Sequence, residues 1–436
     1  MLALVIPLAF QQFMSALVSA SDALMLGTLT QDALSAVSLA SQVAFVENLF
    51  LAAMTIGLSI FAAQYWGKGD IAAAEDVFAY VMKVTLPVSA VFSLAGLYVP
   101  NGLMRLFTNE AVLIEWGAVY LRTVSAGFFL TGVSQVYLCI LKNSGKAGKA
   151  SVIGSTCVVL NIGLNAVLIF GLLGVPAMGV AGAALATVLA RLAEVLWCVW
   201  EVEKRGRVKL RFKKFRICDR AIRSDFWKYT TPVLANEIVW GTGFTMYSVI
   251  MGHLGSDAVA ANAIANIVKN LVACFCLGLG SGSGILVGNE LGAGQLDNAK
   301  EYGGRLCRLS ILCGAASGLV LLILTPVILT LTNLSTQAEG YLKGMLVMCS
   351  CYLIGKSVNS TTIAGIFCAG GDSKFGFFCD VVTMWCIVVP LGFLAAFYIR
   401  LPVLAVYFII NLDEMIKLPA VYLHYRKYRW VRNLTQ

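Results

Sequence analysis

Few ionisable side chains lie inside the long apolar runs of this sequence, and those few are the ones with chemistry to perform. The first is Asp22, near the end of the apolar run Leu2–Gly27, with Ser15, Ser19 and Ser21 nearby. An ionised side chain at the centre of a membrane helix costs at least about 2.5–3.5 kcal/mol, so it needs a partner, a cavity or a role. A buried carboxylate suits reversible ion binding, because a bound H⁺ or Na⁺ restores its neutrality. The alternative is an Asp that neighbouring hydroxyls satisfy permanently.

Two asparagines lie four residues apart in a later apolar run. Asn161 and Asn165 therefore share one face of the predicted helix. Amide carbonyl oxygens are good ligands for hard cations, whereas amides inside membranes also hydrogen-bond between helices. The residues alone leave both roles open.

Three polar residues in the second apolar run form a further candidate group. Gln42, Glu47 and Asn48 are expected to face the interior of the same half of the protein as Asp22. Glu47 equally suits a structural salt bridge with Arg122 of a later run. The sequence does not decide between these interpretations.

The second half of the chain is also charged inside its apolar runs. The candidate polar residues there are Asn236, Glu237, Trp240, Lys356, Asn359, Asp413 and Glu414. Lys356 is predicted to pair with Glu237 or with Asp413. The pair serves either as a static bridge or as a charge that is exchanged during a conformational cycle.

The chain lacks the residue groupings of an enzyme active site. It contains no Ser/His/Asp or Cys/His arrangement and no nucleotide-binding motif. The glycine-rich run Gly278–Gly284 lacks the Gly-Lys-Ser/Thr of a phosphate loop, and it favours close helix packing or a bend. The 13 cysteines have no metal-type pair spacing. We therefore expect no enzyme activity, no cofactor and no ATP-driven pump.

Composition predicts the elements that must position these residues. The chain is 59% hydrophobic and 13% charged, too little polar surface for a water-soluble globule of 436 residues. A bilayer takes about 20 apolar residues per helix, so this length holds about a dozen spans. The 41 glycines suit close helix approach better than a β-barrel. The predicted fold class is an all-α polytopic membrane protein.

Apolar runs separated by turn and charge signals mark twelve predicted spans. Those of the first half are Leu2–Gly27, Ala33–Tyr65, Ala72–Val99, Ala111–Leu141, Ala150–Leu173 and Ala177–Trp200. Those of the second half are Phe226–Leu254, Val259–Gly288, Tyr302–Leu331, Gly340–Phe367, Phe377–Ile399 and Val403–Tyr425.

The two halves of the chain repeat each other. Residues Pro7–Lys83 align without a gap with Pro232–Arg308 at an offset of 225, so that Gly67 meets Gly292. Internal repeats in a polytopic chain are typical of secondary transporters, whose halves rock around a site near the membrane midplane. We therefore predict an N-lobe of residues 1–203, a basic connector of residues 204–225 and a C-lobe of residues 226–436.

Lysine and arginine concentrate in one set of loops, which the positive-inside rule assigns to the cytoplasm. These are the connector, the loops around Lys68, Lys142 and Lys374, and the C-terminal tail, so both termini are predicted cytoplasmic. Each lobe holds an even number of spans, so the two lobes insert with equal orientation. A pseudo-twofold axis then runs along the membrane normal. Topology explains the net charge of +9, and no nucleic acid is expected as a partner.

Six short stretches, in order along nearly the whole chain, carry a family resemblance. They are Asp22–Gly27, Ala62–Asp70, Thr231–Glu237, Val287–Gly294, Ala369–Asp372 and Trp385–Leu391. On these residues the chain resembles the multidrug and toxic compound extrusion (MATE) family of bacterial exporters. The resemblance implies an inner-membrane antiporter that moves Na⁺ or H⁺ inward while expelling amphipathic, often cationic, organic compounds.

The resemblance also implies roles for particular residues. Asp22 matches the family's first-span acid, a proton or sodium site. Asn161 and Asn165 match positions where some relatives carry Asn and then Asp, so Asp22 is left as the chief carboxylate of a cluster that is a possible Na⁺ site. In the tenth span, Ser357 occupies the place of an acid found in some relatives, so a second two-acid cation site does not transfer.

We therefore predict a monomeric, cation-coupled exporter of drug-like organic cations that works by alternating access. The alternative is a flippase for lipid-linked precursors on a related scaffold, which would need a wide and strongly basic cavity. An intramembrane enzyme would need a clustered nucleophile or metal site.

Overall fold

The computed structural model describes residues 2–210, 220–332 and 334–435. The side chains of Leu2, Ala3, Ser19, Ala20, Ala23, Gln31, Arg220, Ala221 and Leu331 are outside this description. Residues 211–219 of the predicted connector also lie outside it.

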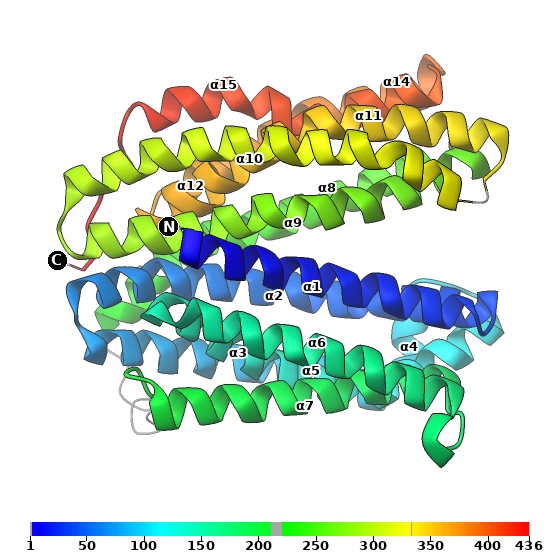
Figure 1. The fold of residues 1–436 in the computed structure, drawn as a ribbon, viewed down its shortest axis with the longest axis horizontal. Coiled ribbons are helices and arrows are strands. Elements are labelled where there is room, and N and C mark those ends of the chain that lie inside the picture. The colour runs from blue at the N-terminus through cyan, green and yellow to red at the C-terminus, as the bar shows by residue number, and fades with distance from the viewer. Residues whose placement is uncertain (1, 211–219, 333, 436) are drawn as a thin grey trace. The chain divides into compact units, whose positions relative to one another are not determined.

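The described residues form helices joined by short turns and include no strand (Figure 1). The first half contains α1 (Leu2–Gly27), α2 (Gln31–Lys68), α3 (Ile71–Tyr98), α4 (Pro100–Arg105), α5 (Ala111–Leu141), η1 (Lys142–Lys146), α6 (Ala147–Phe170), η2 (Leu172–Gly174) and α7 (Gly179–Arg205). The predicted spans of this half coincide with α1, α2, α3, α5, α6 and α7. The short α4 lies between the third and fourth spans.

The second half has more interruptions. Its elements are α8 (Arg220–Gly252), α9 (Ser256–Gly292), α10 (Leu296–Leu331), α11 (Thr336–Asn359), η4 (Ser360–Phe367), α12 (Ser373–Asp380), η5 (Val381–Val388), α13 (Val389–Phe393), η6 (Leu394–Tyr398), α14 (Val403–Ile410) and α15 (Asp413–Tyr425). The seventh to ninth predicted spans are α8, α9 and α10, and α11 with η4 forms the tenth. The eleventh is built from α12, η5, α13 and η6, and the twelfth from α14 and α15. The all-α polytopic prediction is confirmed.

Length and apolar composition alone mark 7 helical stretches among the described residues as able to cross a membrane. They are Asp32–Lys68, Ile71–Tyr98, Ala111–Phe170, Gly179–Arg205, Ser256–Gly292, Leu296–Thr330 and Ser373–Tyr398. The stretch Ala111–Phe170 contains two predicted spans, because α5, η1 and α6 follow one another directly. The first, seventh, tenth and twelfth predicted spans fall outside this set. The tenth and the twelfth carry charged residues inside them, Lys356 in one and Asp413 in the other.

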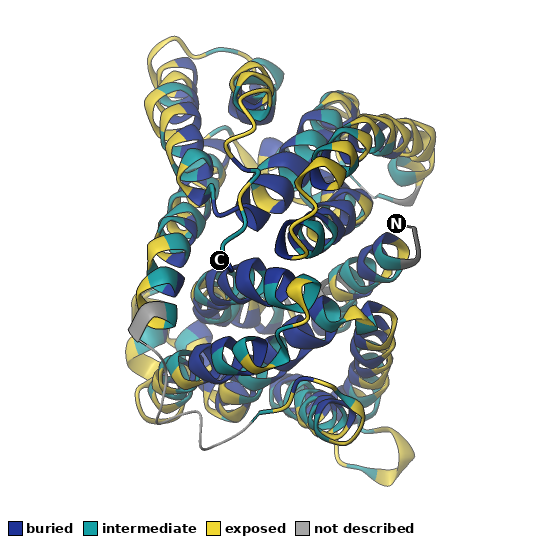
Figure 2. Cartoon of the chain, turned by 90° about the vertical axis from the view of Figure 1, so that its left-hand side faces the viewer, coloured by how far each residue is buried: buried dark blue, intermediate teal, exposed yellow. Residues whose placement is uncertain are grey.

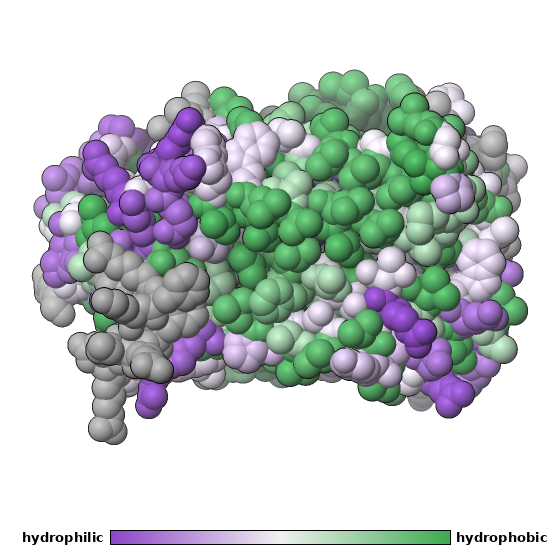
Figure 3. All heavy atoms as spheres, turned by 90° about the horizontal axis from the view of Figure 1, so that it is seen from below, coloured by the Kyte–Doolittle hydropathy of each residue, from purple (hydrophilic) through white to green (hydrophobic). Residues whose placement is uncertain are grey.

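Large apolar side chains are exposed along the helices, as expected where lipid is the solvent. On α10, Leu312, Leu319 and Ile323 are 66%, 58% and 64% exposed. On the face drawn in Figure 3, hydrophobic residues fill a broad central band and hydrophilic residues gather toward its ends. These surfaces match a protein embedded in a bilayer.

The chain divides into two compact units. One contains Met1–Phe13, Ala63–Gly69 and Phe226–Gln436, and the other contains Met14–Ala62 and Asp70–Asp225. In the second unit, Val43, Leu121 and Phe128 pack in a core between α2 and α5. In the first unit, α9, α10 and α11 pack together (Figure 1). Figure 2 shows helices on which buried residues lie on one side and exposed residues on another. The lobe boundaries at residues 203 and 226 stay a prediction.

Within the first unit, the ends of α2 and α9 cross in close contact at positions that the repeat makes equivalent. A Cβ at Gly67 would overlap the carbonyl oxygen of Asn289, and a Cβ at Gly292 would overlap that of Gln64. A Cβ at Gly288 would lie 2.7 Å from the Cβ of its own repeat equivalent, Ala63. Reciprocal contacts of this kind are the mark of a twofold interface. Within this unit, α2 and α9 therefore contact each other through positions that are equivalent in the repeat.

We expect Gly292→Ala to destabilise the protein by about 1–3 kcal/mol, because the new methyl group pushes the backbones of α2 and α9 apart. The thermal unfolding midpoint of the purified protein in detergent checks this. Gly340→Ala is the matched control, since a Cβ there meets nothing within 4 Å. Equal midpoints for the two variants would contradict the close crossing.

The segment after α15 also belongs to this contact. Gln64 is fully buried, and its side-chain nitrogen donates to the carbonyl oxygen of Ala369 at 2.7 Å. Its side-chain oxygen accepts from the backbone nitrogen of Leu434 at 2.7 Å. Trp430 is fully buried beside Gly370, so the predicted cytoplasmic tail is packed onto the fold.

Candidate functional site

A hydrogen-bonded chain joins three helices of the unit that contains α6. The Nδ2 of Asn165 donates to the Oδ1 of Asp22 on α1 at 2.5 Å and to the Oδ1 of Asn161 at 3.1 Å. The Nδ2 of Asn161 then donates to the hydroxyl of Thr187 on α7 at 3.4 Å. Asn161 and Asn165 are one helical turn apart, so the i, i+4 spacing places both amides toward α1 and α7.

The cluster keeps unused oxygen atoms. The Oδ1 of Asn165 is buried and has no hydrogen-bond partner among the described residues. Asn165 itself is 1% exposed, so water does not readily replace the missing donor. A buried acceptor of this kind beside the carboxylate of Asp22 is suited to a small cation.

A second carboxylate and an arginine lie in the same unit. Glu47 is 2% exposed, and its Oε1 has no hydrogen-bond partner among the described residues. Arg191 forms an ion pair with Glu194 at 2.6 Å and also attracts Glu47 and Asp22 electrostatically. Arg122 is exposed, and the described residues show no Glu47–Arg122 ion pair. The alternative of a bridge between those two residues is therefore wrong.

Two of the predicted residues do not join the cluster. Gln42 and Asn48 are exposed on α2, whereas Glu47 between them is buried. Gln42 and Glu47 are five residues apart, and this spacing places their side chains on different faces of the helix. The side chains of Gln42 and Asn48 make no hydrogen bond to Asp22, Asn161 or Asn165 within the described structure.

In the second half, a break in the twelfth span positions two acids. The sequence predicted one continuous helix, but α14 ends at Ile410 and α15 begins at Asp413. Asp413 and Glu414 therefore lie in the first turn of α15. The positive end of a helix dipole stabilises carboxylates at this position.

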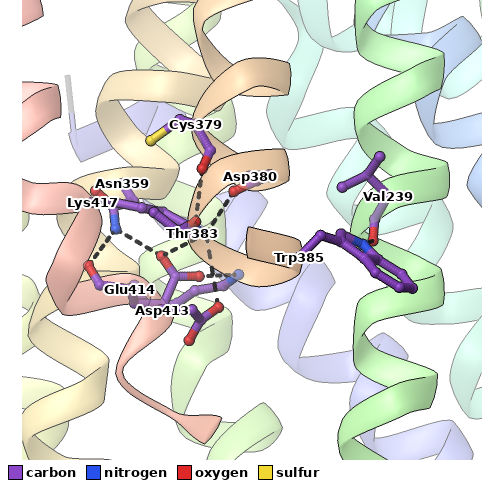
Figure 4. A network of polar contacts seen from close by, with 10 residues as sticks. Val239, Asn359, Cys379, Asp380, Thr383, Trp385, Asp413, Glu414 and Lys417 are labelled. Carbon is purple, nitrogen blue, oxygen red and sulfur yellow. Dashed lines mark hydrogen bonds and ion pairs between the residues drawn. The ribbon is translucent and has the colours of Figure 1, made fainter. Parts of the chain in front are cut away.

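These acids belong to a buried network of charges on three elements (Figure 4). The Nζ of Lys417 lies 2.6 Å from the Oδ1 of Asp380, 3.8 Å from the Oδ2 of Asp413 and 3.9 Å from the Oε2 of Glu414. The Nδ2 of Asn359 donates to the Oε2 of Glu414 at 2.7 Å. In Figure 4 these carboxylates converge on Lys417, while Trp385 lies apart and donates to the carbonyl oxygen of Val239 at 3.2 Å.

The predicted partner of Lys356 is wrong. Its Nζ pairs with the Oε1 of Glu414 at 3.1 Å, and neither Glu237 nor Asp413 forms a described ion pair with it. Adjacent residues on a helix point about 100° apart. The packing of α11 on α15 therefore turns Glu414, and not Asp413, toward Lys356.

The residues predicted on α8 lie at the edge of this network. The ammonium of Lys356 sits 5.7 Å from the ring centre of Trp240, a cation–π contact. Trp240 in turn stacks on Phe244 at 5.8 Å. Glu237 is partly buried, and Lys356 attracts its carboxylate electrostatically. The Oδ1 of Asn236 is buried and has no described hydrogen-bond partner.

Sequence reasoning missed several members of these sites. Thr187 carried no signal, because a threonine in an apolar helix commonly bonds its own backbone. Asp380 and Lys269 could have been found from the sequence, since each is an ionisable residue inside a predicted span. Lys269 also lies three and seven residues after two amides, Asn266 and Asn262, on one face of α9.

Comparisons with known proteins agree with this architecture. The model of the family described as MatE matches residues 7–167 and 232–394. The two matches begin at the same residues, 7 and 232, from which the internal repeat was aligned. One family unit therefore occurs twice in the chain.

Individual relatives match almost end to end. The "Uncharacterized transporter YisQ" of Bacillus subtilis is 24% identical over 94% of this chain and 90% of its own length. The "Probable multidrug resistance protein NorM" of Thermotoga maritima is 23% identical over 92% of this chain and 86% of its own. The solved structure of a MOP superfamily transporter from Pyrococcus furiosus superimposes with a TM-score of 0.89, at 20% identity, over 98% of this chain and 94% of that one. This last likeness shows a shared fold of twelve helices in two lobes.

Proposed function

Because the chain belongs to the MATE family of multidrug efflux transporters, we propose that it is a cation-coupled antiporter that exports amphipathic, often cationic, organic compounds. The observation that carries the proposal is the chain of hydrogen bonds from Asp22 through Asn165 and Asn161 to Thr187. It links a membrane carboxylate to two neighbouring helices, so a change in the charge of Asp22 acts on all three.

Ion binding at Asp22 would rearrange this chain. Asn165 now presents its nitrogen to Asp22 and leaves its oxygen without a donor. A Na⁺ ion needs oxygen ligands, so its arrival would require the amide of Asn165 to turn and release the hydrogen bond to Asp22. A proton would instead neutralise the carboxylate and convert it into a donor. Either event changes how α1 is held against α6.

Coupling requires that the ion bind one conformation more tightly than the other. Moving a conformational ratio from 1:99 to 99:1 requires about 5.5 kcal/mol of differential binding. Neutralising a carboxylate in an apolar surrounding supplies part of this free energy, because the ionised form is costly there. In the proposed cycle, inward-moving Na⁺ or H⁺ favours the conformation that releases the organic substrate outward.

The remaining features of the proposal follow from the sequence. The protein would work as a monomer in the inner membrane, with both termini and the basic connector of residues 204–225 in the cytoplasm. The even number of spans in each lobe and the lysine- and arginine-rich loops support this orientation. Export would then use alternating access between an N-lobe of residues 1–203 and a C-lobe of residues 226–436.

Ethidium efflux from proteoliposomes tests the proposed function. Purified protein is reconstituted, loaded with ethidium, and given an imposed Na⁺ gradient or pH gradient in separate experiments. We expect one of the two gradients to accelerate efflux over protein-free liposomes, and dissipation of that gradient to remove the acceleration. Efflux that ignores both gradients would refute cation-coupled export.

A further inference from the structure

A small cavity lies within the unit that contains α8, α9 and α14, and no residue of the Lys417 charge network lines it. Its volume is about 20 Å³, and it is partly open to solvent. Its polar lining comes from Tyr247, Asn262, Asn266, Lys269 and Asn411. A space of this size takes about one or two water molecules, whereas pockets for whole drug-sized ligands span about 300–1,000 Å³. The cavity therefore suits only one small functional group at the end of a larger molecule.

Lys269 is the one charged residue in the cavity lining, and it is 8% exposed. Its ammonium lies 4.9 Å from the ring centre of Tyr352, which is a cation–π contact. Among the described residues, no carboxylate lies within ion-pair distance of it and no acceptor forms a hydrogen bond with it. A buried ammonium with three donors and no acceptor is costly unless something else supplies one.

The nearby carboxylates are already engaged. Glu414 pairs with Lys356, and Asp413 and Asp380 face Lys417. Of these, Asp413 and Glu414 act on Lys269 electrostatically without contacting it. Because these carboxylates are held in other ion pairs, the N–H donors of Lys269 remain available to a ligand in the cavity.

Other groups around the cavity also lack partners. The hydroxyl of Tyr247 is buried and has no described hydrogen-bond partner. Asn266 donates to the side-chain oxygen of Asn262 at 3.2 Å, which leaves the NH₂ group of Asn262 without a described acceptor. The cavity therefore brings together an ammonium, a hydroxyl and an amide that can all donate hydrogen bonds.

We propose that this cavity binds a carboxylate group of a transported organic compound, with Lys269 as the charge partner and Tyr247 and Asn262 as neutral donors. A carboxylate has two acceptor oxygens and one charge, which match a single ammonium and neutral donors. A phosphate carries more charge than one lysine balances. This inference rests on the proposed export function and extends it, since it assigns a place in this half of the protein to one functional group of the substrate.

A pair of fluorescent dyes tests the site directly. Rhodamine B is a cation that also carries a carboxylate, and its ethyl ester is the same cation without that charge. Fluorescence anisotropy of each dye against the purified full-length protein in detergent gives two dissociation constants. We expect the wild-type protein to bind the acid about tenfold more tightly than the ester, the size of one hydrogen-bonded charge contact.

Variants then assign this preference to the cavity. Lys269→Met should bring the ratio of the two dissociation constants to about one, and Lys269→Arg should keep most of the preference. Lys343→Met is the matched control, because Lys343 is exposed on α11 and does not line the cavity, and it should leave the ratio unchanged. Tyr247→Phe, which removes only the hydroxyl, should lower the ratio and gives a second test if Lys269→Met does not fold.

The outcomes separate the site from the proposed function. Equal affinity of the wild type for acid and ester, or a preference that persists in Lys269→Met and Tyr247→Phe, overturns the carboxylate site. If that happens while an ion gradient still drives ethidium efflux, the exporter stands without the site. If the preference depends on Lys269 but no gradient drives efflux, the site stands and the proposed export function fails.

Discussion

Asp22→Asn is expected to abolish gradient-driven efflux of ethidium from proteoliposomes. The amide keeps the shape of the side chain and one acceptor oxygen for the hydrogen bond from Asn165, but it removes the charge that a cation neutralises. The ion would then no longer distinguish the two conformations, and a coupling of typically 5- to 150-fold in affinity, about 1–3 kcal/mol, is lost. Initial efflux rates under the effective gradient, measured for wild type and variant at equal protein density, check this result.

Asp32→Asn is the matched control for this prediction. It makes the same chemical change at an exposed acid in the first turn of α2, outside the hydrogen-bonded chain of Asp22. Efflux by this variant should remain at the wild-type rate. Wild-type efflux by Asp22→Asn would remove Asp22 from the coupling mechanism, whatever the behaviour of the control.

Lys417→Met is expected to lower the free energy of unfolding by about 3–5 kcal/mol, the cost of leaving buried carboxylates without their cation. Lys417 and Asp380 are 3% and 10% exposed and lie 2.6 Å apart, and Asp413 and Glu414 also face the same ammonium. Methionine keeps the length of the side chain and removes the charge. The thermal unfolding midpoint of the protein in detergent should fall accordingly.

Two further variants show whether charge is the cause. Lys417→Met combined with Asp380→Asn removes a cation and an anion together, so the midpoint should recover in part. Lys300→Met breaks an exposed ion pair with Asp297, whose partners are 42% and 96% exposed, and such pairs contribute at most about 1 kcal/mol. A loss for Lys417→Met no larger than that for Lys300→Met would argue against a buried network that stabilises this half.

The sequence predicted the spans well because apolar runs and their turn signals are local properties. α3, α5 and α9 begin and end within a few residues of the predicted limits. The twelfth span was the exception, since a break at Asn411 and Leu412 divides it. A signal was present there, because Asn411, Asp413 and Glu414 follow one another closely in an otherwise apolar run.

The candidate sites were predictable only as lists of residues. Asp22, Asn161 and Asn165 were proposed as a cluster on a family resemblance, and hydrogen bonds do join their side chains. Gln42 and Asn48 were proposed on the same ground, their polarity, and both are exposed on α2. The polarity of a residue inside a span indicates that the residue needs a partner. It does not indicate how the helix is turned about its axis, and that rotation decides which partner the side chain contacts.

By itself, the sequence determined that this protein is a duplicated helical membrane protein with a few carboxylates, amides and lysines inside its spans. These features follow from the hydropathy, the repeat spacing and the charges of the sequence. None of them depends on which distant residues contact each other, so all can be obtained from the sequence alone. Only the tertiary structure decided that Gly67 meets Asn289, that Lys356 pairs with Glu414 and that Lys269 faces a cavity. Each of these depends on how far a helix is turned about its axis and how closely its neighbour approaches. Packing between segments far apart in the chain sets both quantities.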